Sequence, residues 1–319
     1  MYLLMSNSSA MLNRYADDSA LRRRRGKVFQ KKRMTCMGKR IILSADSTCD
    51  LGDALQQKYQ VHYYPFHILL AGKDYQDNVD IHPEDIYQAW WERKALPKTA
   101  AINVAEYEAY FRQWVEDGFE VVHLNLGSGL SSAYQNCVQA ARQLGHVYPV
   151  DSGNLSTGIG LLVLRAADMI QEGMEAAEIA KRLESLKSRV HSSFILDTLE
   201  FMRAGGRCSA VTAFGANVLG LKPCIEVQNT DGSMKVGKKY RGRLDKVLVS
   251  YVKDKLAAYP DIDQSRLFIT HSGIEERYIR LVEETVRSQL SFKEIFITKA
   301  SCTISCHCGP NTLGILFMT

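Results

Sequence analysis

Hydrophobic and polar positions alternate in short blocks from residue 40 onward. Apolar runs at 41–43, 121–126 and 147–150 are typical of buried strands, and each leads into a polar loop rich in Gly, Ser or Asp. Amphipathic stretches with helical spacing follow these loops. The repeated order of strand, loop and helix predicts a doubly wound parallel sheet, in which ligands bind at the carboxyl ends of the strands.

Further strands and helices are expected in the first half, and several of the helices have a typical N-terminal residue. Residues 61–70 are aromatic and β-branched and predict a second strand region. Asp50 is placed to cap a helix over 51–59, Pro83 opens another, and 105–116 form a third. Ser131 or Ser132 should cap the next helix, and one more begins near Ser156.

The second half is less regular and predicts a smaller α/β domain with a mixed sheet. Helices are expected at 176–188, 244–257 and 275–289, a short one ends at Gly205, and strands are expected at 194–196, 267–270 and 294–298. The turn at 229–232 predicts a hairpin. The expected division is a leader at 1–39, a parallel-sheet domain at 40–184 and a mixed-sheet domain at 185–319.

Charge separates the leader from the body. The chain of 319 residues carries a formal net charge of +5, but residues 1–40 alone carry +9 and the rest −4. The basic run at 14–33 could bind nucleic acid or an acidic membrane surface. A disordered tail, or a start codon placed before Met34 or Met37, is the interpretation we favour. Because the body is acidic, nucleic acid is not an expected partner.

Cysteine usage and hydropathy indicate a cytoplasmic protein. Eight cysteines are scattered through a chain without an export signal, which favours reduced thiols. No apolar run reaches the ~20 residues that span a bilayer. Cys302, Cys306, His307 and Cys308 could supply metal ligands, but in a strand Cys306 and His307 would face opposite sides, so no metal site is expected.

Hydroxyl groups collect in the strand-end loops and suggest an anion site. They are accompanied by free amides at helix starts, which favour negative charge; the alternative is that each serine only caps its own helix. The chain has neither a GxSxG nor a GxxxxGKS motif, so nucleophilic catalysis and nucleotide phosphotransfer are poorly supported. An enzyme acting on a small anionic metabolite stays open as an alternative and predicts a polar, open cleft.

Several segments along the chain together match the ordered motifs of a known family, at residues 44–51, 96–99, 127–134, 150–152, 199–207, 222–223 and 307–314. In these segments the sequence resembles the DegV family, and the resemblance covers about 40–319. It implies a two-domain DegV-like fold and a fatty-acid-binding subunit that serves a bacterial fatty acid kinase.

The resemblance also implies a division of roles. A long-chain fatty acid would lie in an apolar tunnel between the domains, with its carboxylate held by Thr99 and Ser131 and assisted by His307. Arg207 would lie near the surface where the kinase docks. The kinase would supply ATP and form the acyl phosphate, a phospholipid precursor. This subunit would need no cofactor, would not be an enzyme itself, and could contact the membrane transiently.

Some positions depart from the family pattern. Ala100, Ala101 and Ile102 replace a usual Ser-Gln-Pro after Thr99, and the serine loop has Ser132 and Ala133 in place of Gly and Thr. Cys308 and Asn311 replace a common Thr and Gly near the end of the chain. Both central hydroxyls are retained, so carboxylate binding is expected, while the loop geometry and the preferred acyl chain are not specified.

Overall fold

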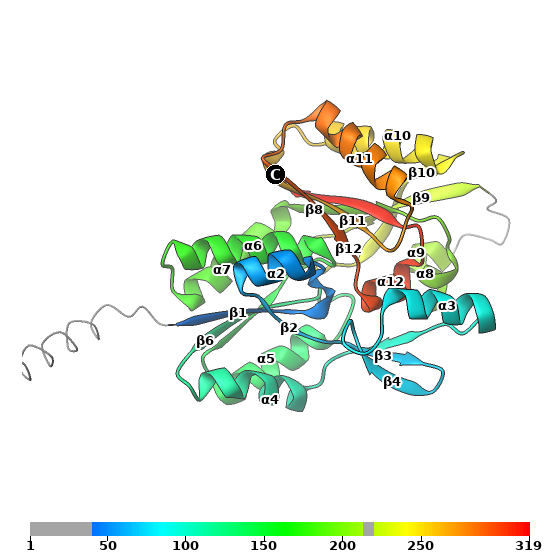
Figure 1. Ribbon diagram of the computed structural model, residues 1–319. Helices are drawn as coiled ribbons and strands as arrows, with labels where there is room; N and C mark the ends of the chain where they lie inside the picture. The colour runs from blue at the N-terminus through cyan, green and yellow to red at the C-terminus, as the bar shows by residue number, and fades with distance from the viewer. Residues whose placement is uncertain (1–39, 213–219) are drawn as a thin grey trace, which may run out of the picture. The chain divides into compact units, whose positions relative to one another are not determined.

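A parallel sheet in the order β2-β1-β6-β7 forms one half of the molecule (Figure 1). The computed structural model describes residues 40–212 and 220–319, so the predicted leader and its basic run lie outside the described residues. The four strands are β1 (Ile41–Asp46), β2 (His62–Tyr64), β6 (Glu120–Asn125) and β7 (Val147–Asp151). One face is covered by α4 (Val104–Val115) and α5 (Ala133–Leu144), and the other by α2 (Gly52–Tyr59), α6 (Thr157–Gln171) and α7 (Ala176–Leu186).

A six-stranded mixed sheet, in the order β10-β9-β8-β13-β11-β12, forms the other half. Of its neighbouring strands only β11 and β12 run parallel. The strands are β8 (Val190–Ile195), β9 (Leu221–Val227), β10 (Met234–Arg241), β11 (Asp263–His271), β12 (Glu294–Lys299) and β13 (Leu313–Met318). Helices α10 (Leu244–Ala257) and α11 (Glu276–Gln289) cover one face (Figure 1). The two sheets confirm the predicted α/β class with a parallel and a mixed sheet.

Helix α6 lies between the two sheets and contacts strands of both. Its side chains from Thr157 to Leu164 are all buried, which is the all-round apolar pattern of a helix at the centre of a core. Residues 41–319 form one compact unit. The boundary expected near residue 184 stays a prediction.

A third, small antiparallel sheet was not predicted from the sequence. It has the order β4-β3-β5, with β3 (His67–Leu70), β4 (Lys73–Gln76) and β5 (Lys98–Ala100), and it packs near α3 (Pro83–Arg93) and α12 (Cys302–Cys308). The remaining elements are η1 (Ser47–Cys49), η2 (Lys187–Arg189), α8 (Glu200–Gly205) and α9 (Ser209–Thr212). No helix in the two described ranges is long and apolar enough to cross a membrane.

Three local predictions were wrong. Residues 61–70 form two strands in different sheets, because Pro65 has no N–H to donate and the Phe66 N–H turns to Ser47 Oγ. Asp50 does not cap α2; it has a left-handed φ of 54° and its carboxylate binds elsewhere. The segment with Cys306 and Cys308 is helical, because the Ser301 side chain caps it by accepting from the Ile304 N–H.

Candidate functional site

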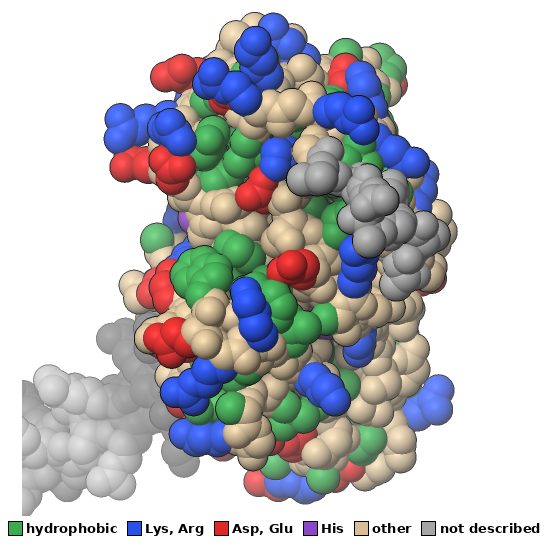
Figure 2. Space-filling view, turned by 90° about the vertical axis from the view of Figure 1, so that its right-hand side faces the viewer, with side chains coloured by type: hydrophobic (Ala, Val, Ile, Leu, Met, Phe, Trp, Pro, Cys, Tyr) green, Lys and Arg blue, Asp and Glu red, His purple; other side chains and the backbone are tan. Residues whose placement is uncertain are grey.

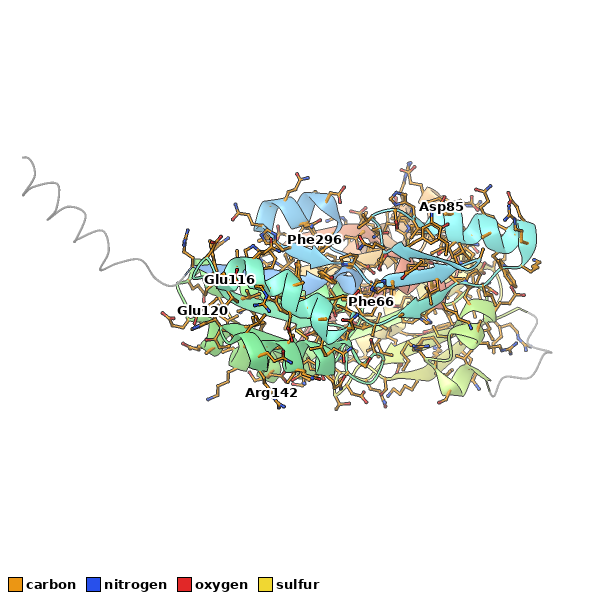
Figure 3. All side chains as sticks on the ribbon, turned by 90° about the horizontal axis from the view of Figure 1, so that it is seen from below. Phe66, Asp85, Glu116, Glu120, Arg142 and Phe296 are labelled. Carbon is orange, nitrogen blue, oxygen red and sulfur yellow. The ribbon has the colours of Figure 1, made fainter. Side chains whose placement is uncertain are left out.

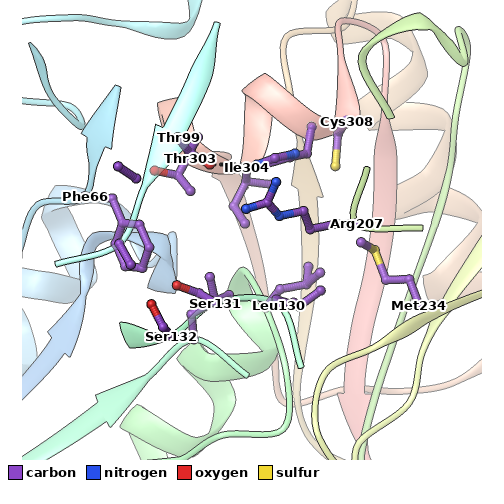
Figure 4. Close-up of a pocket in the computed structure, with 15 residues that line it drawn as sticks. Phe66, Thr99, Leu130, Ser131, Ser132, Arg207, Met234, Thr303, Ile304 and Cys308 are labelled. Carbon is purple, nitrogen blue, oxygen red and sulfur yellow. Dashed lines mark hydrogen bonds between the residues drawn. The ribbon is translucent and has the colours of Figure 1, made fainter. Parts of the chain in front are cut away.

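A cavity of about 190 Å³ lies where the small sheet, the start of α5, the hairpin β9–β10 and α12 meet (Figure 4). Most of its lining is apolar: Phe66, Ala100, Ala101, Leu126, Leu130, Leu155, Met234, Ile304 and Cys308. The polar lining consists of Thr99, Ser131, Ser132, Arg207, Thr303 and His307. The four residues predicted from the sequence, which span more than 200 positions, therefore line a single cavity.

Thr99 and His307 are joined directly. Thr99 lies on β5, which pairs with β3 at the edge of the small sheet, and His307 lies in the last turn of α12. The Thr99 Oγ1 and His307 Nε2 atoms are 3.0 Å apart. The histidine was predicted to follow a strand and to be exposed at a domain edge. It is instead partly buried at the end of a helix, because the helix turns it toward the cavity.

His307 is neutral at neutral pH. Burial, together with the positive charge of Arg207, lowers the pKa of its imidazole from 6.5 to about 4. Within the described part of the chain, its buried Nδ1 atom has no hydrogen-bond partner. Gly205 faces that atom, and a Cβ at this position would lie 2.1 Å from it. Gly205 is therefore a glycine because the imidazole occupies the space where a side chain would be.

Ser131 lies in the loop that leads into α5. Its Oγ atom accepts a hydrogen bond from the Ala133 N–H at 3.2 Å, while Ser132 occupies the N-cap position without a side-chain cap bond. Of the two predicted serines, Ser132 therefore takes the N-cap position, and the Ser131 bond reaches only the first helical residue. The hydroxyl proton of Ser131 is left available to a ligand near the positive end of the helix dipole.

Arg207 is exposed and lines the opening of the cavity. Its Nη1 donates to the Gly205 carbonyl at 2.8 Å, which holds the stem of the side chain beside α8. Figure 4 shows its guanidinium group extending across the cavity in front of Ile304. Arg207 is the one fully charged side chain in the described lining.

Helix α12 is held in place by two buried carboxylates. Asp50 accepts from the Ser301 N–H at 2.9 Å and Asp77 accepts from the Cys302 N–H at 2.7 Å. Burial raises the pKa of Asp50 from 3.8 to about 7 and also raises the pKa of Asp77. These contacts fix the start of the short helix that carries His307 and Ile304.

A second buried network supports the loop with Ser131. Asp46 accepts from the Leu126 N–H at 2.8 Å and from the Tyr107 hydroxyl at 2.6 Å. His123 lies between Ser44 Oγ and Asp46 Oδ1, at 2.9 and 3.1 Å. Although Ser, His and Asp are together, all three side chains are fully buried, so this arrangement orients the loop and cannot reach a substrate.

The hairpin turn between β9 and β10 closes over the same loop. The Gly129 N–H donates to the Asp231 carbonyl at 2.8 Å. A Cβ at Gly127 would lie 2.6 Å from that carbonyl, and one at Gly153 would lie 2.3 Å from the Asn229 carbonyl. The glycines of the strand-end loops therefore allow the mixed sheet to approach the parallel sheet closely.

Sequence reasoning missed part of the lining. Phe66, which lies in the interior of the molecule (Figure 3), and Met234, at the start of β10, come from segments with no motif. Pro65 was the available signal for the bend that brings Phe66 inward. The cysteines of α12 are buried and free, and the described residues contain no group of three or more His, Cys, Asp or Glu arranged to hold a metal ion.

Comparison with known proteins gives the family. The family model described as an uncharacterised protein of the DegV family matches residues 40–319. The chain belongs to the DegV family. The resemblance inferred from the ordered segments is thereby confirmed.

Relatives match the DegV chain along nearly their whole length. A DegV domain-containing protein of Caldanaerobacter subterraneus is 29% identical over 282 residues, which cover 87% of this chain and 98% of that protein. A solved structure described as fatty acid binding of a DegV family protein from Thermus thermophilus has a TM-score of 0.80 at 29% identity and covers 88% and 100% of the two chains. The structure of DegV from Bacillus subtilis, described as a fatty acid binding protein, has a TM-score of 0.74 with 88% and 100% coverage; at 24% identity it shows the shared fold.

Proposed function

We propose that this DegV protein binds a long-chain fatty acid and holds its carboxylate with Thr99, Ser131 and His307. The observation that carries the proposal is the composition of the cavity, whose lining is mainly aliphatic or aromatic and whose hydroxyl groups come from one strand, one loop and one helix. An amphiphile with a single polar head matches such a site. The fatty-acid-binding protein of Thermus thermophilus, at 29% identity, supports the choice of ligand class.

The hydrogen bonds within the protein leave the hydroxyl protons of Thr99 and Ser131 free to bind a carboxylate. When the neutral His307 carries its proton on Nε2, it donates to Thr99 Oγ1, and the Thr99 hydroxyl proton can point to the ligand. Ser131 Oγ accepts from a backbone N–H, so its proton is available in the same way. Two O–H donors are what an ionised carboxylate, an acceptor-only group, requires.

The tail should supply most of the affinity. Burying a 16-carbon tail removes about 15 methylene-type groups from water, nominally about 12 kcal/mol, before the costs of association and ordering. Each hydrogen bond to the carboxylate contributes about 1.5–3 kcal/mol. Thr99 and Ser131 therefore determine where the head lies, while the apolar walls hold the ligand.

We further propose that the bound carboxylate is presented, in the cytoplasm, to an ATP-dependent fatty acid kinase that forms the acyl phosphate. In this proposal the subunit itself is a carrier without cofactor, and Arg207 contributes to docking of the kinase. The exposed position of Arg207 at the opening supports that role. Figure 2 shows hydrophobic side chains near the middle of one face of the molecule, with side chains of both charges spread around them.

The alternative, an enzyme acting on a small anionic metabolite, predicts a polar and open cleft. The aliphatic lining of the cavity does not favour it. The described serine, histidine and aspartate that lie within hydrogen-bond distance of one another are fully buried beneath the loop.

The proposal is tested by extracting the purified protein. Protein prepared without detergent is denatured and extracted with organic solvent, and the extract is analysed by mass spectrometry. We expect one long-chain fatty acid per chain; an unrelated protein purified from the same host serves as the control. A clean absence of fatty acid, together with failure to bind an added one, would contradict the proposal.

A further inference from the structure

A second, smaller cavity of about 30 Å³ lies directly beyond the first. Leu155, Ile304 and Cys308 line both cavities, so these three side chains form the wall between them. Figure 4 shows Ile304 and Cys308 on the α12 side of the first cavity. Leu155 faces them from the loop before α6.

The first cavity alone is small for a long acyl chain. Its volume of about 190 Å³ is below the range of about 300–1,000 Å³ that is usual for pockets enclosing drug-sized ligands. A long tail whose head lies at Thr99 and Ser131 must therefore continue further into the protein. The second cavity offers an apolar path, lined by Phe194, Leu316 and Ala300.

The hydroxyl groups around the second cavity are occupied by internal partners. Ser193 is bonded to Tyr251, Thr270 to Thr157, and Ser272 to the Gly309 carbonyl. Because these donors are satisfied within the protein, they offer nothing to a polar ligand. The space suits a hydrocarbon end.

The backbone on both sides of the wall is fixed by one carboxylate. Asp50 accepts from Ser156 Oγ at 2.5 Å, next to Leu155, and from the Ser301 N–H at 2.9 Å, at the start of the helix that carries Ile304. Ser156 has φ 52° and ψ −143°, a region that residues other than glycine rarely adopt, and the bond to Asp50 helps to hold it there. Opening the wall therefore requires side-chain movement and not movement of the helices.

We propose that Leu155, Ile304 and Cys308 form a gate between the two cavities and that the size of the residue at 308 sets the length of acyl chain the protein accepts. The inference rests on the proposed function, since it concerns the tail of the same ligand. Chains that end before the gate fit the first cavity; longer chains pass between the three side chains into the second.

Cys308 is suited to this position. Its side chain is one of the smallest apolar groups, and burial together with the charge of Asp50 raises the pKa of its thiol to about 12, so it stays neutral. A neutral thiol offers a narrow apolar wall without a strong hydrogen-bonding group. Its backbone carbonyl accepts from the Thr312 hydroxyl at 3.0 Å, which fixes the end of α12.

The experiment compares chain-length profiles. Delipidated wild-type protein and the variants Cys308→Met, Cys308→Ala and Cys306→Met are each equilibrated with an equimolar mixture of saturated fatty acids of about 10 to 18 carbons, and the bound species are identified by native mass spectrometry. Cys306→Met is the matched control, because Cys306 is equally buried on the same helix but lines neither cavity.

We expect Cys308→Met, which adds two carbon-sized groups to the wall, to shift the most abundant bound acid to a chain shorter by about two carbons. Cys308→Ala should shift the most abundant bound acid to longer chains. If Cys308→Met does not fold, the chain-length profile of Cys308→Ala tests the gate. Cys306→Met should keep the wild-type profile. Unchanged profiles in both Cys308 variants, with fatty acid bound, would overturn the gate alone, whereas wild-type protein that binds no fatty acid would overturn the proposed function.

Discussion

The Thr99 hydroxyl and the His307 imidazole form a hydrogen bond of 3.0 Å across 208 positions of the chain. This bond connects the edge strand of the small sheet to the last helix. It lies at the polar part of a cavity whose other walls are mainly apolar. If the cavity holds a carboxylate as we propose, two segments that no local sequence pattern relates would jointly set the position of the head group.

Thr99→Ala should weaken the hold on the carboxylate while leaving the tail buried. We expect affinity for a long-chain fatty acid to fall by about 10- to 100-fold, the loss of one hydrogen bond to a charged group at about 1.5–3 kcal/mol. Lipid retained through purification should fall only partly. Thr99→Ser keeps the hydroxyl and should bind close to wild type in a fluorescence displacement titration. Equal losses in both variants would show that the methyl group, not the hydroxyl, matters.

Ser131→Ala should give a loss of similar size for the same reason, and Ser132 provides a neighbouring control. Both serines line the cavity, but only Ser131 has its oxygen oriented by a backbone N–H, that of Ala133. We expect Ser132→Ala to bind within about threefold of wild type, since an exposed hydroxyl contributes little. The two variants are compared by isothermal titration; a larger effect at Ser132 would contradict the assignment.

Gly205→Ala should displace the His307 imidazole from the cavity and so act like a substitution of His307 itself. The added Cβ would lie 2.1 Å from His307 Nδ1, so the ring must leave its place and lose the bond to Thr99. We expect kinase-dependent acyl-phosphate formation to fall at least about tenfold, and more than lipid binding does. Gly206→Asn is the control: no atom lies within 4 Å of a Cβ there, and asparagine tolerates its left-handed φ of 67°. Wild-type activity in Gly205→Ala would contradict this account.

Arg207→Ala should leave fatty acid content near that of wild type and reduce phosphorylation by the kinase. The guanidinium lies at the opening and is exposed, so its main contribution is expected at the docking surface. Arg207→Lys keeps the charge and should restore part of the activity. The measurements are lipid content and acyl-phosphate formation on the same preparations. If Arg207→Ala lost lipid as severely as Ser131→Ala, the guanidinium would instead be a partner of the carboxylate.

Asp50 and His307 should affect stability in opposite directions as pH changes. Burial raises the pKa of Asp50 from 3.8 to about 7. The contribution of Asp50 to the free energy of unfolding is therefore fully present below pH 3.8 and is lost as the pH rises toward 7. The pKa of His307 is lowered from 6.5 to about 4. The contribution of His307 to the free energy of unfolding is therefore fully present above pH 6.5 and is lost as the pH falls toward 4. Between these values the two effects oppose each other.

Asp50→Asn should reveal the contribution of His307. The amide keeps the shape of the carboxylate but does not titrate, so the variant lacks the stability that wild type gains as Asp50 takes up its proton. Between pH 6.5 and about 4 the free energy of unfolding should therefore fall by about 3 kcal/mol more in the variant than in wild type. Urea unfolding at a series of pH values measures this difference. Parallel pH profiles for the two proteins would show that Asp50 does not bind its proton in this range.

Much of the fold followed from local patterns. Pro83 marked the first turn of α3 and the turn at 229–232 marked the hairpin, because such signals act within a few residues. The splitting of 61–70 was signalled by Pro65 but depends on Ser47, which accepts from the Phe66 N–H. The helix at Cys302–Cys308 was missed although Ser301 is a good cap residue.

The candidate site was predictable only where the family resemblance supplied it. Thr99, Ser131, His307 and Arg207 were named from motif positions, and the structure brings them to one cavity. The role of Asp50 could not be inferred, because its partners Ser156 and Ser301 lie 106 and 251 positions away. Long-range contacts of this kind depend on the assembled fold and leave no periodic signal.

Helix α6, buried between the two sheets, has a consequence for how the protein comes apart. If either sheet lost its contact with this helix, the apolar face that the helix covers would be exposed to water. Separation of the two halves would therefore expose core residues of both. Partial melting of one half would therefore be costly, and the body should unfold in one cooperative step. A ligand that enters between the halves must do so through rotation of side chains, since opening the halves like a hinge would remove the helix from one of its two partners.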